Sequence, residues 1–293
     1  MNWSLDAISH SGKAVHFDSP SPGLMGPDQL PGLDRWQPVP DLSVVPLLAL
    51  PPWLMNQLYS NNEKLPDALS FFQVQCRRWL PIGQQQYQTE ICDGQWKTRG
   101  HGKSVVTGEL RHCFQPTPEP MSPLPETEVN VYTDSLSENS VAQCVNYAHR
   151  GDRGVTTWID LRQLPPATHG QIVSPALVES IFHGVPWNQP AVWDSRIPAD
   201  HLVLPALISE LNISSVEKLV DVCAKRSAVM RCELRSTGNY GSWEFPVFRA
   251  QLILDEQVLV WTKFVGACWQ RSALRHAINS ALRPDQTRTR ESN

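Results

Sequence analysis

The sequence predicts an α+β fold: a mixed sheet with helices on its faces, together with a smaller, proline-rich N-terminal part. Three observations carry this prediction. Composition changes near residue 129, strand and helix patterns alternate from 129 to 235, and a β-hairpin and a C-terminal helix follow over 247–282. Alternation of this kind is typical of α/β layering around a partly parallel sheet.

Proline placement divides the chain into four parts. Residues 1–52 carry nine of the 25 prolines and are expected to form an irregular arm, because proline lacks an N–H and disfavours helix before it. Residues 53–114 are predicted to be a small α+β region. Residues 115–128 form a semi-rigid linker rich in proline, and 129–293 form the main α/β domain.

The N-terminal region has apolar patterns typical of helices at 53–59 and 65–79. The pair Asp93-Gly94 lies between strand-like residues and predicts a hairpin, since both central residues of a type I′ turn need positive φ. Further strands are expected at 104–107 and 112–114.

The main domain is predicted to alternate between strands and helices. The expected strands are 129–132, 155–161, 201–204 and 228–234. The expected helices are 137–149, 174–183, 206–211 and one that opens at Ser215. Pro175 stands at the first position of the second helix, where proline is favoured. A hairpin over 247–254 and 258–265 and a helix over 267–282 complete the domain.

Composition narrows the function classes. The formal net charge is −4, so the whole chain carries no electrostatic signature for nucleic acid. The start lacks a signal-peptide pattern, and no apolar run is long enough to span a membrane. Seven cysteines without paired spacing are typical of reduced thiols. We therefore expect a cytoplasmic protein that has no membrane segment and no cofactor.

Two acids follow predicted strands. Asp134 and Asp160 could lie at the carboxyl edge of a parallel sheet and share a Mg²⁺ for phosphodiester cleavage. The alternative is that Thr133-Asp134-Ser135 is an ordinary helix cap, and no third or fourth carboxylate follows.

Imidazoles and further carboxylates gather between residues 169 and 201. The set has no spacing of a zinc site, so no metal centre is predicted. His183 is expected at a helix C-terminus, where the helix dipole favours a positive ring. The set consists of His169, His183, Asp194, Asp200 and His201.

The loop Gly238–Trp243 combines residues that suit both an ordinary turn and a binding tip. Together with two earlier tryptophans it is the predicted contact surface, and two arginines of the C-terminal helix could touch phosphate. The candidate binding residues are Trp187, Trp193, Tyr240, Trp243, Arg271 and Arg275.

None of these motifs provides a complete set of catalytic residues. The expected function is a non-enzymatic binding or assembly protein whose partner is another protein. Two alternatives stay open: a metal-dependent phosphodiester-cleaving enzyme using Asp134 and Asp160, and an accessory protein that contacts nucleic acid through the basic C-terminal helix.

Overall fold

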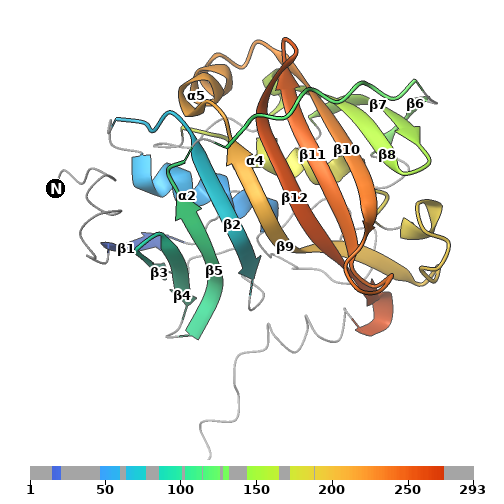
Figure 1. Cartoon of the computed structure of the whole chain (residues 1–293), viewed down its shortest axis with the longest axis horizontal. Helices are drawn as coiled ribbons and strands as arrows, with labels where there is room; N and C mark the ends of the chain where they lie inside the picture. The colour runs from blue at the N-terminus through green and yellow to red at the C-terminus, as the bar shows by residue number, and fades with distance from the viewer. Residues whose placement is uncertain are drawn as a thin grey trace, which may run out of the picture.

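The computed structural model describes residues 15–20, 47–59, 64–76, 86–100, 103–113, 115–125, 128–131, 144–164, 172–187 and 189–273. Twelve strands in these ranges form one sheet in the order β1-β3-β4-β5-β2-β9-β12-β11-β10-β8-β7-β6 (Figure 1). Each neighbouring pair runs antiparallel. The two halves of the sheet meet where β2 pairs with β9.

The first half holds five strands and the helix α2. The strands are β1 (Val15–Pro20), β2 (Leu69–Cys76), β3 (Gln86–Cys92), β4 (Gln95–Gly100) and β5 (Lys103–Arg111). The helix α2 (Leu50–Tyr59) follows the short η2 (Leu47–Ala49) and confirms the helix expected at 53–59. The predicted Asp93-Gly94 turn is also confirmed, with φ of 49° and 75°.

The second half holds the other seven strands. They are β6 (Glu128–Val129), β7 (Val145–Gly151), β8 (Gly154–Asp160), β9 (His201–Ile213), β10 (Val229–Asn239), β11 (Pro246–Leu254) and β12 (Gln257–Gln270). Its helices are η3 (Leu161–Gln163), α4 (Pro175–Glu179), η4 (Ser180–Gly184), η5 (Pro190–Val192) and α5 (Val216–Lys225). The helices expected at 174–183 and after Ser215 are confirmed, as is the hairpin of β11 and β12.

The predicted α+β class, with its mixed, α/β-like sheet, is wrong. The sheet is antiparallel, and most of the segments that were expected to alternate are strands. Residues 206–211 lie in β9, and residues 145–149 lie in β7. Of the helix expected at 267–282, residues 267–270 belong to β12, 271–273 are helical and the rest lies outside the described residues.

Bulges explain two of the wrong helices: the one expected at 206–211, and the one expected at 65–79, of which residues 69–76 form β2. In β2 the register shifts between Phe72 and Gln75, and Gln73 has a φ of 50°. The extra residue brings Phe71 and Val74 to the same buried side, so a strand shows the i, i+3 spacing that predicts a helix. A similar irregularity lies on β9, where the consecutive β12 residues Val265 and Gly266 pair with Leu207 and Pro205, and a bulge tolerates a proline within a sheet.

Residues 115–125, which we call the strap, cross the sheet on the face turned toward the viewer in Figure 1, with α2 and α4 behind. Every third strap residue is half-buried, and the residues between them are exposed. A repeat of three residues is that of a polyproline II helix. The half-buried residues are Gln115, Pro118, Met121 and Leu124.

Side chains of the sheet bind the strap's backbone. Gln251 on β11 accepts from the Met121 N–H at 2.8 Å and donates to the Glu119 carbonyl at 3.0 Å. Thr156 on β8 accepts from the Leu124 N–H at 2.8 Å. Side-chain partners of this kind satisfy a backbone whose prolines and extended shape rule out internal hydrogen bonds.

The helices α2 and α4 pack against each other, and α4 also packs against η2. Leu50, Leu54 and Met55 of α2 are fully buried, as are Leu177 and Val178 of α4. The two central helices therefore form the core beneath the continuous sheet. In the described part of the chain, no helix is long and apolar enough to cross a membrane.

Candidate functional site

The segment α4–η4 runs through the interior of the second half. Pro175 starts it, and the Ser180 hydroxyl donates to the Leu177 carbonyl at 2.6 Å where the helix tightens. It ends at Gly184, where any Cβ would collide with the Val155 side chain on β8. Glycine there lets the helix end lie directly against the sheet, where η4 packs on β7, β8 and β10.

Glu179 is the last residue of α4 and a buried acid. Glu179 is only 3% exposed. In the described structure, its Oε2 has no hydrogen-bond partner. Burial without a compensating charge disfavours the carboxylate, and it raises the pKa of Glu179 to about 8. The acid is therefore largely protonated at neutral pH and still able to release its proton there.

His183 follows one turn later and is fully buried in η4. Burial lowers the pKa of His183 to about 3, so its ring is neutral near pH 7. The expectation that the helix dipole keeps this ring positive is wrong, because desolvation outweighs the dipole inside the core. A neutral acid and a neutral imidazole thus lie four residues apart on the segment at the centre of the molecule.

This combination is suited to proton transfer. A general acid or base works best when its pKa lies near the working pH, and burial is the usual way to raise a glutamate to that range. Perturbed carboxyls also occur in purely structural settings, but those are paired with charges or hydrogen bonds. Glu179 Oε2 lacks such a partner among the described residues.

The structure describes one of the two acids predicted for catalysis. Asp160, at the end of β8, caps η3 and binds Arg162, whose guanidinium donates at 2.7 Å. The Arg162 hydrogen bonds lower the pKa of Asp160 to about 2. Asp134 lies outside the described residues, and among those described no three His, Cys, Asp or Glu side chains are placed to hold a metal.

The predicted binding residues separate into two groups. Trp187 and Trp193 are 1% and 7% exposed, so they are part of the core and not of a contact surface. Tyr240 is 73% exposed at the turn between β10 and β11, and Trp243 packs edge-on against His201 at 5.7 Å between ring centroids. Arg271 follows β12, and Arg275 lies outside the described residues.

The sequence analysis singled out His183 and missed Glu179. A signal for it was present: Glu179 is a charged residue within the apolar stretch Ala176–Phe182, on the helix predicted at 174–183. A lone acid in such a stretch is either paired or functional. The expected parallel sheet had pointed instead to carboxylates at strand ends.

Solved structures of polyketide synthase dehydratase domains share this fold. The dehydratase domain from the CurJ module of curacin polyketide synthase has a TM-score of 0.61 and 13% identity, covering 91% of this chain and 95% of that chain. The dehydratase domain of PpsC from Mycobacterium tuberculosis, in complex with C12:1-CoA, has a TM-score of 0.61 and 13% identity over 87% of this chain and 94% of that one. The arrangement is the hotdog fold of these domains.

An isomerase shares the fold as well. The trans-acyltransferase polyketide synthase enoyl-isomerase matches with a TM-score of 0.57 and 10% identity, over 77% of this chain and 90% of that chain. No protein-family model and no curated protein sequence matches this chain. At such identities the likeness establishes the fold.

The expectation of a non-enzymatic binding or assembly protein is overturned by these matches, which are described as dehydratase and isomerase domains. The expectation rested on the lack of a catalytic constellation in an assumed α/β sheet. In the antiparallel fold, the place to look for catalytic residues is the interior around α2 and α4. The phosphodiester alternative rested on the same assumed sheet, whose strands are in fact antiparallel. Contact with nucleic acid rested on the basic C-terminal segment, which lies outside the described residues after position 273, and stays a prediction.

Proposed function

We propose that this protein is an acid–base enzyme that transfers protons on an acyl compound, in a dehydration or a double-bond isomerisation, with Glu179 as the proton-carrying residue. The observation that carries the proposal is the buried, uncompensated carboxyl of Glu179, whose pKa is raised to about 8. The fold shared with dehydratase and isomerase domains supports the reaction class.

Both reactions need one group that exchanges a proton with carbon near a carbonyl. In an isomerisation, the carboxylate removes a proton from one carbon, the double bond shifts, and the carboxyl returns the proton to another carbon. In a dehydration, the carboxylate removes the proton next to the carbonyl, and the resulting carboxyl gives that proton to the hydroxyl, which departs as water as the double bond forms. Glu179 is suited to either role because both of its forms are accessible near neutral pH.

His183 is the second residue of this interior. A neutral imidazole can donate one hydrogen bond and accept another, which suits it to polarise or orient a group near Glu179.

A cytoplasmic location and a protein partner stay predictions, the first motivated by seven cysteines without a disulfide.

The test is an activity assay on model acyl thioesters. The whole chain is incubated with a 3-hydroxyacyl, a 2-enoyl and a 3-enoyl thioester, and product is followed by mass spectrometry and by the absorbance of the conjugated enoyl group. Glu179→Gln keeps the shape of the neutral acid and removes the proton exchange. We expect its rate to fall roughly 10²- to 10⁴-fold.

Glu210→Gln on β9 is the matched control, since it makes the same chemical change away from α4. It should keep the parental rate. Thermal unfolding of both variants checks that they are folded. If the parental protein converts none of the three thioesters, the proposed reaction class is wrong. If folded Glu179→Gln keeps the parental rate, the proposed role of Glu179 is wrong.

A further inference from the structure

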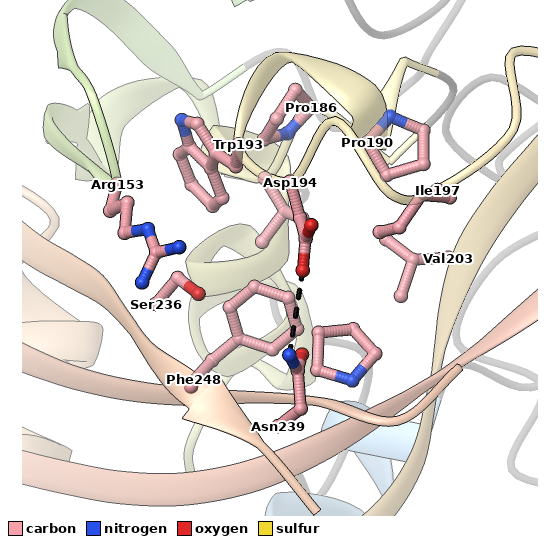
Figure 2. A pocket seen from close by; sticks show the side chains of 13 residues that line it. Arg153, Pro186, Pro190, Trp193, Asp194, Ile197, Val203, Ser236, Asn239 and Phe248 are labelled. Carbon is pink, nitrogen blue, oxygen red and sulfur yellow. Dashed lines mark hydrogen bonds between the residues drawn. The ribbon is translucent and has the colours of Figure 1, made fainter. Parts of the chain in front are cut away.

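The segment that carries Glu179 is held firmly at its far end. The Trp187 carbonyl accepts from the Val203 N–H of β9 at 2.8 Å, and Gly184 lies against Val155 of β8. Beyond this end, the side chains drawn in Figure 2 leave a cavity of only about 20 Å³, room for roughly one water molecule. Such close packing gives this end of the segment little room to move.

The near end of the segment has little stability of its own. The helix α4 has only five residues, and its N-cap residue Ser174 makes no side-chain hydrogen bond to it. Pro175, at the first helical position, has no N–H to offer. A helix this short is not stable alone, so the position of α4 depends on the contacts that hold the residues leading into it.

Asn56 holds those residues from the other half of the sheet. It lies on α2, 117 residues before Val173 in the chain, and donates from Nδ2 to the Val173 carbonyl at 2.8 Å. Its Oδ1 accepts from the Ile172 and Val173 N–H groups at 2.9 Å each. Because Asn56 is only 3% exposed, these bonds are stronger than they would be in water, and together they fix the backbone that enters α4.

The connection from this backbone to the acid is short. Ser174 and the single helix α4 link Val173 to Glu179, so a displacement at Val173 is carried to the carboxyl. Proton transfer is sensitive to such displacements, since about 1 Å can cost roughly 10²-fold in rate. Burial raises the pKa of Glu179 to about 8, and a less deeply buried carboxyl would therefore have a lower pKa.

We propose, on the basis of the function proposed for Glu179, that Asn56 is a positioning residue for this carboxyl. The helix α2 of the first half fixes the backbone from which α4 of the second half presents its acid, so the site depends on both halves. Asn56 takes no direct part in proton transfer, because its amide is engaged with backbone groups.

The test compares Asn56→Ala with a control that is destabilised elsewhere. Ile253→Ala on β11 is that control, since Ile253 is 2% exposed and is buried outside the cluster of core residues to which α2 and α4 belong. Truncating it also destabilises the fold. The whole chains are assayed on whichever thioester the parental protein converts, with trimethylamine N-oxide in every sample to favour the folded state.

We expect kcat to fall roughly 10²-fold in Asn56→Ala, and to stay near the parental value in Ile253→Ala. Asn56→Asp is a milder second variant, because it keeps an acceptor for both N–H groups and loses only the donor to the Val173 carbonyl. It should lose roughly tenfold, about the value of one hydrogen bond.

A pH profile separates positioning from a general loss of stability. Parental kcat/KM should rise with pH up to the pKa of Glu179, about 8, because the carboxylate form removes the first proton. In Asn56→Ala this rise should move to lower pH by about one unit or more, since weaker burial favours the charged form. In Ile253→Ala it should stay where the parental rise lies.

The measurements distinguish a wrong role for Asn56 from a wrong function for Glu179. Asn56 does not position the acid if either of its variants keeps the parental rate and pH profile while Glu179→Gln loses activity. The same conclusion follows if Ile253→Ala loses as much rate as Asn56→Ala, or if its pH profile moves as far. If the parental protein converts no thioester, or if Glu179→Gln keeps the parental rate, the function proposed for Glu179 is wrong and the role of Asn56 falls with it.

Discussion

Three buried polar side chains are accommodated in three different ways. Glu233 on β10 is fully buried beneath the strap and binds Thr156, Arg231 and Arg235 at 2.7 to 3.1 Å. Asn56 on α2 has its amide satisfied by backbone groups. The Oε1 of Glu233 also lacks a hydrogen bond, but it lies 3.1 Å from the Arg231 guanidinium. Glu179 is the one of the two buried acids without a charged partner in the described structure, which is the reason to assign it to chemistry and the other two residues to structure.

Replacing Asn56 by alanine should strongly destabilise the fold. Its Oδ1 accepts from the Ile172 and Val173 N–H groups at 2.9 Å each, and its Nδ2 donates to the Val173 carbonyl at 2.8 Å. Asn56→Ala would leave these backbone groups without a partner, and we expect a loss of about 3 kcal/mol in the free energy of unfolding by urea. The exposed Asn146→Ala should lose less than about 0.5 kcal/mol, and equal losses in the two variants would refute this role for Asn56.

The strap shows how a proline-rich element can become part of a fold. It buries every third residue and relies on the sheet for its hydrogen bonds. Arg235 and Arg231 also donate to the carbonyls of Ser122 and Met121, at 2.9 and 3.2 Å. The arginines that pair with Glu233 thus hold the strap as well, so the buried charge and the strap stabilise each other.

Gln251→Ala should loosen the strap at one point. The Met121 N–H loses its acceptor, and its hydrogen exchange should accelerate roughly tenfold, the equivalent of about 1.4 kcal/mol. The Leu124 N–H keeps Thr156 and should change less. Gln257→Ala, at the exposed first residue of β12, should leave both amides as they were. Equal acceleration at Met121 and Leu124 would show that Gln251 does not act locally.

At the same scale, the sequence predicted an element correctly where a single residue fixes its start or its turn. Pro175, Ser215 and Asp93-Gly94 each have a local physical meaning, and each prediction was confirmed. The strands β2 and β9 were misassigned in part because a bulge and a proline-tolerant irregularity disturb the two-residue period. Glu179 was missed because its significance depends on tertiary burial, which no local pattern reports.

The molecule has two halves that share one continuous sheet, and the helices of both halves pack on one face of it. β2 pairs with β9 across the junction, and α2 packs against α4 behind it. Asn56 joins α2 to the residues that lead into α4. The carboxyl of Glu179 therefore lies on the segment where the halves meet.

The protonation of Glu179 in the folded protein tests the account most directly, through urea unfolding of the parental chain and Glu179→Gln as a function of pH. The unfolded chain releases this proton near pH 4.5, whereas the folded protein holds it until about pH 8. The folded state thus binds more protons in this window, so parental stability falls as pH rises through it.

Relative to Glu179→Gln, the parental protein should lose up to about 5 kcal/mol between pH 4.5 and 8, at about 1.4 kcal/mol per pKa unit. The difference between the two proteins should be flat outside that window. Parallel stability curves for the two proteins across it would show an ordinary, ionised glutamate at position 179, and would contradict the account.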